Sequence, residues 1–199
     1  MAREEEIRLI ERAKHGHADA FRELVETYQD RLAAFVWKMV RNHHEVEDLC
    51  QNAFVKAYES LGSYSSNYAF STWLFTIAYR MCLNHLRKKK AISGDTDFSY
   101  IGSGEPDASV SLAASEEAQR LRDLIWAAVD TLTPPQKSAV LLFYREGQSC
   151  QEIGVVLGIP AVTVKSHLHR AREKLRKLLS VELAEDWLSV RNLGESSGA

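Results

Sequence analysis

The feature that most constrains the fold is the stretch 149–179, which predicts two helices joined by a tight turn. Ser149 and Glu152 have the S-x-x-E spacing of a capping box, in which a hydroxyl and a carboxylate satisfy free backbone donors at the start of a helix. Gly158 follows the last apolar residue of this helix and supplies the permissive backbone of a tight turn. Pro160 suits the entry of the second helix and not its interior. We therefore expect a short helix, a glycine turn and a longer helix.

The predicted second helix has one apolar face and one basic face. Its apolar residues recur at helical spacing and form one narrow stripe: Val164, Leu168, Ala171, Leu175 and Leu178. Residues 161–177 also hold six Lys or Arg residues against a single acid. This arrangement is typical of a helix-turn-helix, whose second helix enters the major groove. A surface αα-hairpin with solvated charges is the alternative, but the capping box, the turn, the proline and the segregated face together favour DNA binding.

The composition predicts a globular protein that stays in the cytoplasm. Hydrophobic residues make up 45% of the 199 residues, which is ample for helical cores. No apolar run approaches the roughly 20 residues that span a bilayer, and the acidic start MAREEEIRL is unlike a signal peptide. Three widely spaced cysteines without a C-x-x-C pattern indicate buried, reduced thiols and no metal site: Cys50, Cys82 and Cys150.

Helical periodicity without any strand pattern predicts an all-α chain of two small helical domains. We expect the first domain at 1–90 and the second, which contains the helix-turn-helix, at 116–180. Residues 91–115 are rich in Gly, Ser, Asp and Pro and predict a flexible linker. The tail 181–199 begins amphipathic and ends in Gly and Ser, so packing on its own domain and packing on a partner both stay open.

A second candidate nucleic-acid surface lies at the end of the first domain. A helix that runs to about residue 90 has Trp73 near its start and the basic run 87–90 at its end. Aromatic side chains beside cations suit stacking on unpaired bases. The sequence is equally consistent with an alternative in which Trp73 is a core residue and the cations only complement the helix dipole at its carboxyl end.

The order of these segments resembles the extracytoplasmic-function group, or group IV, of bacterial RNA polymerase sigma factors, which have only regions 2 and 4. Residues 16–28 resemble region 2.1, 45–58 resemble region 2.2, and 70–90 resemble regions 2.3 and 2.4. Residues 132–175 resemble region 4. The resemblance covers most of the chain. It implies a transcription initiation factor that binds core RNA polymerase, recognises the minus-10 and minus-35 promoter elements and helps to melt DNA, without an enzymatic activity or a cofactor.

The resemblance also implies three sets of contacts. Core polymerase would bind, through its β′ clamp helices and β flap, to Asp48, Gln51, Asn52, Phe54, Val140 and Leu141. The minus-10 element, with a flipped-out base, would be held by Ser63, Tyr64, Ala69, Phe70, Trp73, Arg80, Arg87 and Lys88. The minus-35 duplex would be read by Thr163, Lys165, Ser166, His169, Arg170 and Arg172. Asn52 stands where the family usually has Glu, and Arg80 where it usually has Asn, so we expect a weaker charge at the polymerase contact and a changed base preference.

The resemblance further implies regulation by an anti-sigma factor, often in a stress response, and no insertion into a membrane. The leading alternative is a helix-turn-helix repressor or activator that acts without polymerase. Such a protein binds duplex DNA alone, usually as a symmetric dimer, and gives Trp73 no role. An enzyme is disfavoured, because the His and Cys residues form no nucleophile-base set and no metal-ligand spacing.

Overall fold

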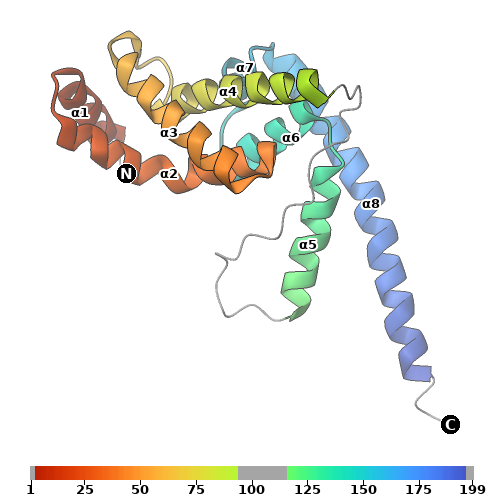
Figure 1. Ribbon diagram of the computed structural model, residues 1–199. Helices are drawn as coiled ribbons and strands as arrows, with labels where there is room; N and C mark the ends of the chain where they lie inside the picture. The colour runs from red at the N-terminus through yellow and green to blue at the C-terminus, as the bar shows by residue number, and fades with distance from the viewer. Residues whose placement is uncertain (1–2, 94–115, 196–199) are drawn as a thin grey trace.

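The computed structural model describes residues 3–93 and 116–195, and every regular element within these ranges is helical (Figure 1). We call residues 3–93 the N-terminal bundle; it contains α1 (Arg3–Lys14), α2 (Ala18–Val40), α3 (His43–Glu59), the 3-10 turn η1 (Leu61–Ser63) and α4 (Phe70–Ser93). We call residues 116–195 the C-terminal bundle; it contains α5 (Glu116–Asp130), α6 (Pro134–Val140), the π-helical turn η2 (Leu141–Arg145), α7 (Cys150–Leu157) and α8 (Ala161–Glu195). The all-α prediction is confirmed. The linker was predicted for 91–115; its first three residues, 91–93, belong to α4, and the rest lies outside the described residues.

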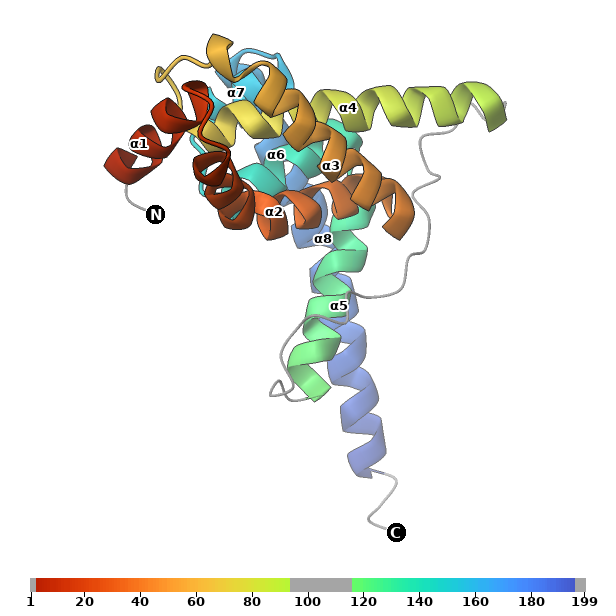
Figure 2. The same cartoon turned by 60° about the vertical axis from the view of Figure 1, so that its left-hand side comes forward.

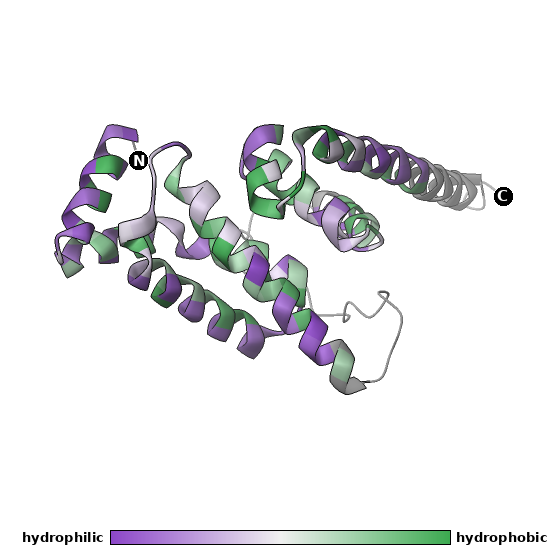
Figure 3. Ribbon diagram, turned by 90° about the horizontal axis from the view of Figure 1, so that it is seen from above, coloured by the Kyte–Doolittle hydropathy of each residue, from purple (hydrophilic) through white to green (hydrophobic). Residues whose placement is uncertain are grey.

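The N-terminal bundle forms around the long helix α2, whose apolar residues recur every three or four positions. Leu24, Leu32 and Phe35 are at most 1% exposed, and the ring of Phe35 lies 5.1 Å from that of Phe75 in α4. Hydrophobic and hydrophilic bands alternate along the helices, as expected where one face is buried (Figure 3). Helix α2 ends at Arg41, which adopts the left-handed conformation (φ 58°) and donates its backbone N–H to the carbonyl of Trp37.

The C-terminal bundle contains the predicted helix-turn-helix. The Ser149 hydroxyl accepts a hydrogen bond from the backbone N–H of Glu152, and the Glu152 carboxylate accepts one from the backbone of Ser149, so the capping box is present. Gly158 ends α7 at φ 69°. Helix α8 continues past the predicted end near residue 179 to Glu195, and it contacts α5 of the same bundle (Figures 1 and 2).

The two bundles also touch each other. Helix α7 packs on α4 of the N-terminal bundle (Figures 1 and 2), and buried residues of both bundles join one hydrophobic core. This contact places the helix-turn-helix beside the start of α4, where the second candidate surface lies.

Candidate nucleic-acid and polymerase interfaces

The first half of α8 presents the predicted basic face to solvent. Val164, Leu168 and Ala171 are at most 2% exposed and fix the orientation of the helix against the bundle. Of the predicted minus-35 residues, Thr163 is half-buried and the others are exposed: Lys165, Ser166, His169, Arg170 and Arg172. A helix held on one side by its own core and lined with cations on the other has the form of a major-groove reader.

Two contacts within the C-terminal bundle restrain this face. The Arg172 guanidinium donates from Nε to the Tyr144 hydroxyl at 2.8 Å and lies 5.7 Å from the ring of Phe143. The Ser166 hydroxyl donates to the carbonyl of Val162 at 3.1 Å. Arg172 is therefore oriented by aromatic neighbours before any ligand binds.

The basic face also extends beyond the predicted residues. A shallow hollow farther along α8 is lined by Arg170, Glu173, Lys174, Arg176, Lys177 and Ser180. Cations at this distance from the start of the helix suit contacts to phosphates rather than to base edges. The cations of this hollow could have been found from the sequence, since they belong to the same six basic residues of 161–177.

The start of α4 forms the second candidate surface. Trp73 is half-buried, and its ring lies 5.4 Å from that of Tyr64 and 5.7 Å from that of Phe70. Tyr64 is only 8% exposed and Phe70 is fully buried, so these two side chains support Trp73 from the core side and do not face solvent as their predicted role requires. Tyr68, which the sequence analysis omitted, is 42% exposed in the loop before α4 and is the aromatic residue that this loop offers to a base.

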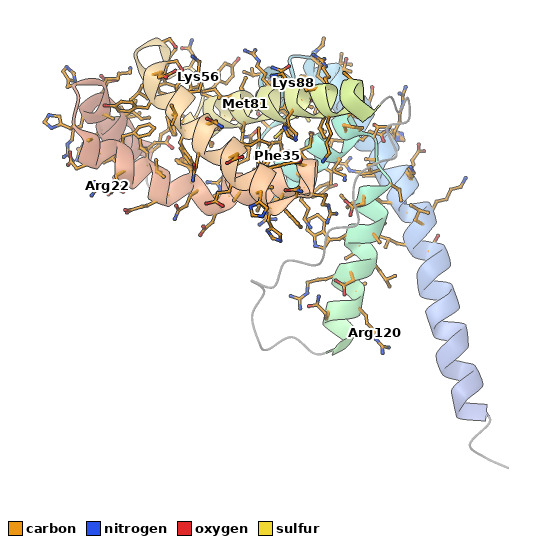
Figure 4. The ribbon with its side chains drawn as sticks, in the orientation of Figure 1. Arg22, Phe35, Lys56, Met81, Lys88 and Arg120 are labelled. Carbon is orange, nitrogen blue, oxygen red and sulfur yellow. The ribbon has the colours of Figure 1, made fainter. Side chains whose placement is uncertain are left out.

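Several polar residues accompany Trp73. Ser63 is exposed and Ala69 is half-buried. Arg80 and Arg87 follow Trp73 at intervals of seven residues, so they lie on the same face of α4, and both are exposed. Lys88 is exposed toward the far end of the helix (Figure 4). The structure thus joins a half-buried aromatic residue and three cations along α4.

The acid Glu45 is part of this electrostatic arrangement. Its carboxylate, in the first turn of α3, lies 3.0 Å from Nε2 of His85 and 3.0 Å from Nζ of Lys89 in α4. Partial burial opposes ionisation of Glu45, yet hydrogen bonds from Lys89 and His85 lower its pKa below the ordinary value. Glu45 therefore connects α3 to the basic end of α4, besides complementing the dipole of its own helix.

The predicted polymerase residues divide into an exposed set and a buried set. Asp48, Gln51 and Asn52 are exposed on one face of α3. Phe54 does not share this face, because it is 8% exposed and packs in the core; its neighbour Val55, 55% exposed, lies with the polar residues instead. Val140 and Leu141 are 8% and 3% exposed, so neither is available at the surface of this conformation.

Within residues 3–93 and 116–195, no group of His, Cys, Asp or Glu side chains is placed to hold a metal ion, and the three cysteines are unpaired. None of the helices in these ranges is long and apolar enough to cross a membrane.

Two family models match the chain: Sigma-70 region 2 over residues 24–92 and Sigma-70, region 4 over residues 122–175. The chain is 36% identical over 183 residues to the ECF RNA polymerase sigma factor SigW of Bacillus subtilis, an alignment that covers 85% of this chain and 94% of that protein. It is 34% identical to the RNA polymerase sigma-H factor of Pseudomonas aeruginosa, with 93% and 99% covered, and 31% identical to the ECF RNA polymerase sigma-E factor of Escherichia coli, with 84% and 90% covered.

Two solved structures that share the fold are complexes. The sigma factor RpoE of Bartonella quintana, solved with the anti-sigma factor NepR, superposes with a TM-score of 0.66 at 25% identity, covering 81% of this chain and 97% of that chain. CnrH in complex with the cytosolic domain of CnrY shares the fold with a TM-score of 0.63 at 24% identity, covering 87% and 96%.

Proposed function

This chain belongs to the extracytoplasmic-function family of RNA polymerase sigma factors, and we propose that it is a group IV member that acts in the cytoplasm. It binds core RNA polymerase, recognises the minus-10 and minus-35 promoter elements and helps to melt DNA for transcription initiation. The observation that carries this proposal is the solvent-exposed basic face of α8. The N-terminal bundle adds a second surface, on which Trp73 and the cations Arg80, Arg87 and Lys88 follow one another along α4. As a regulatory subunit, the chain requires no catalytic residue or cofactor of its own.

The two surfaces divide the work between duplex and single strand. In the C-terminal bundle, α8 enters the major groove of the minus-35 element, with Lys165 and Arg170 at base acceptors or phosphates and Ser166 and His169 as further polar contacts. Each phosphate neutralised by a cation releases counterions, so this binding weakens steeply with salt. The free energy of this duplex contact anchors the polymerase upstream.

The N-terminal bundle captures bases that melting exposes. Trp73 and Tyr68 provide stacking faces at the start of α4, and Arg80, Arg87 and Lys88 follow the strand toward the end of that helix. Stacking contributes about 1–3 kcal/mol per base and extruding a base costs a few kcal/mol, so several contacts of this kind are needed to hold the strand open. Arg80, where the family usually has Asn, changes the hydrogen bonds offered to the flipped base.

Core polymerase binds to the exposed face of α3. Asp48, Gln51 and Asn52 form its polar part, and Val55 adds an apolar side chain. Val140 and Leu141 reach the β flap only if the surroundings that bury them in this conformation rearrange. We retain 1–90 and 116–180 as the two functional domains, 91–115 as their linker and 181–199 as a tail.

An anti-sigma factor is the expected regulator. The solved relatives RpoE and CnrH are each bound to a partner protein, NepR or the cytosolic domain of CnrY. A partner that holds the two bundles together would cover surfaces needed for polymerase or promoter. A helix-turn-helix regulator that acts without polymerase leaves the match to Sigma-70 region 2 unexplained, and the sigma factor is therefore favoured over it.

Run-off transcription with purified core polymerase on a library of genomic fragments tests this function. The chain should direct defined transcripts from a small subset of fragments, and core polymerase alone should not. Absence of any chain-dependent transcript across the whole library would end the proposal.

A further inference from the structure

Among the Phe, Tyr and Trp side chains that the structure describes, Tyr144 is the most exposed, and it lies beside the basic face of α8. The residue is 60% exposed, and its hydroxyl accepts a hydrogen bond from Nε of Arg172 at 2.8 Å. The guanidinium carbon of Arg172 lies 5.8 Å from the centroid of this ring and 5.7 Å from that of Phe143, and the two rings meet edge to face at 5.0 Å. We call Phe143, Tyr144 and Arg172 the aromatic–arginine cluster.

The π-helical turn η2 holds Tyr144 in this exposed position. The backbone N–H of Glu146 donates to the carbonyl of Leu141 at 3.3 Å, a spacing one residue wider than in an α-helix. Leu141 and Leu142 are 3% and 0% exposed, so the start of the turn is fixed in the core while Tyr144 lies in solvent. Turns of this kind are frequent at functional sites. A tyrosine that is exposed, yet held at its backbone and at its hydroxyl, suits a binding contact better than core packing.

Arg172 lies in line with two of the residues expected to read the minus-35 duplex. It follows His169 by three residues and Lys165 by seven, so all three share one face of α8, and all three are exposed. With a rise of about 1.5 Å per residue, Arg172 is about 10 Å farther along the helix axis than Lys165. The major groove is about 8.5 Å deep and about 12 Å wide. When Lys165 reaches the base edges, Arg172 and Tyr144 therefore lie at the rim of the groove, where the phosphates are.

The hydrogen bond between Tyr144 and Arg172 leaves donors free for an anion. A tyrosine hydroxyl both accepts and donates, so Tyr144 keeps its own proton for another acceptor. The bond engages Nε of Arg172, and the terminal Nη atoms remain for the oxygen atoms of a phosphate. Glu173, the single acid of 161–177, lies 3.9 Å from Nδ1 of His169 and forms no ion pair with Arg172 within the described part of the chain. The positive charge of Arg172 is therefore available to a ligand.

The cluster also orders Arg172 before DNA binds. A free arginine side chain samples many rotamers, and ordering it on binding offsets part of the free energy that a phosphate contact contributes. Here the hydroxyl of Tyr144 and the rings of Tyr144 and Phe143 restrict the guanidinium in advance. The arrangement is itself favourable, since a guanidinium is attracted to aromatic rings within about 6 Å. Tyr144 is thus a positioning residue for Arg172 as well as a donor.

We propose that Tyr144 and Arg172 together bind one backbone phosphate at the rim of the major groove of the minus-35 duplex. This inference rests on the proposed function, and it gives a DNA contact to Tyr144, which lies outside the helix that enters the groove. The terminal nitrogens of Arg172 and the hydroxyl of Tyr144 donate to the same phosphate. Because a phosphate carries no sequence information, this contact contributes affinity without base preference.

Duplex binding by the full-length chain at low salt tests the site, because phosphate contacts act on any duplex. Tyr144→Phe keeps the ring and removes only the hydroxyl, so we expect about fivefold weaker binding to a minus-35 duplex and to an unrelated duplex alike. Arg172→Ala should weaken both about tenfold and reduce the slope of log K against log salt by about 1. The matched control is Arg120→Ala, which removes the same charge from an exposed position in α5 (Figure 4) and should change neither quantity.

A neutral phosphate analogue identifies the contact itself. A single methylphosphonate is placed in turn at each phosphate of the minus-35 region. At one position the unmodified chain should lose about tenfold in affinity, whereas the double variant Tyr144→Phe/Arg172→Ala should lose nothing further there. A purely structural role of the pair predicts instead that the double variant is as sensitive as the unmodified chain at every position.

Three results overturn the proposal: equal sensitivity at every phosphate, Tyr144→Phe that binds like the unmodified chain, and a loss confined to one duplex sequence, which would make Arg172 a reader of bases. The outcome for the proposed function is separate. If the phosphate contact is found but no fragment is transcribed with core polymerase, the proposed function fails and the site stands. If transcription is directed normally while any of the three results is obtained, the site fails and the proposed function stands.

Discussion

Gly154→Ala should destabilise the helix-turn-helix. The backbone of the turn that follows α7 leaves no room for a Cβ at position 154. A Cβ at Gly154 would lie 2.7 Å from the carbonyl oxygen of Ile159 and 3.5 Å from the backbone nitrogen of Ala161. That carbonyl has little freedom to move away. The N–H of Ile159 donates to the carbonyl of Gly154 at 3.0 Å, and Gly158 holds the turn in its left-handed conformation.

The size of the effect follows from two opposing contributions. Alanine gains up to about 1 kcal/mol of helix propensity over glycine, whereas overpacking against backbone costs about 1–3 kcal/mol. We expect a net loss of about 1 kcal/mol in the free energy of unfolding. Because α8 must shift to relieve the overlap, the loss in the free energy of binding to the minus-35 duplex should be larger than this.

Urea denaturation and duplex binding measure the two losses. Gly62→Ala is the matched control, since its Cβ meets no atom within 4 Å, and it should stay within about 0.5 kcal/mol of the unmodified chain. Equal stability and equal duplex affinity of the two variants would show that α7 and α8 are not closely packed at Gly154.

Three further predictions concern DNA binding and pH. Arg170→Ala should weaken minus-35 binding and leave the affinity for core polymerase unchanged. If the side chain contacts a phosphate, the slope of log K against log salt should also fall by about 1. An equal loss of both affinities would show that Arg170 has only a structural role. Tyr68→Ala should cost about 1–3 kcal/mol in binding a single-stranded minus-10 oligonucleotide, measured by fluorescence titration, and Tyr68→Phe should retain the stacking; no difference between them would remove Tyr68 from the site. Burial lowers the pKa of Lys137 to about 8 from 10.5, although the Asp130 carboxylate favours the charged form. Unfolding therefore takes up a proton above pH 8, and the free energy of unfolding should rise by about 1 kcal/mol between pH 8 and 9; the same slope in Lys137→Met would contradict this assignment.

The helix-turn-helix could be predicted from sequence because its determinants are local. The capping box joins residues three positions apart, and the glycine turn depends on the backbone freedom of Gly158 alone. The end of α8 was not predictable in the same way. No glycine or proline interrupts the chain between Pro160 and Gly194, and the residues after 180 begin amphipathic, so the sequence carries no stop signal near residue 179.

The exposure of individual apolar residues was harder to predict. The resemblance placed Phe54 at the polymerase contact, whereas helical periodicity already puts it on the apolar face of α3 with Ala53 and Ala57, and the structure buries it there and leaves Val55 exposed. Tyr64 and Phe70 were expected at the DNA surface and instead lie beneath Trp73. Contacts between the bundles had no sequence signal, because Arg41 and Asp130 are 89 positions apart and each reads as an ordinary surface charge.

The central claim is that this chain recognises promoters as a subunit of polymerase and not by itself. The most direct test measures binding of one promoter fragment, identified by run-off transcription, to the chain, to core polymerase and to their mixture at a single salt concentration. Only the mixture should form a tight, promoter-specific complex, with thymines of the minus-10 region reactive to permanganate. Tight duplex binding by the chain alone, unchanged when core polymerase is added and without reactive thymines, would contradict the account.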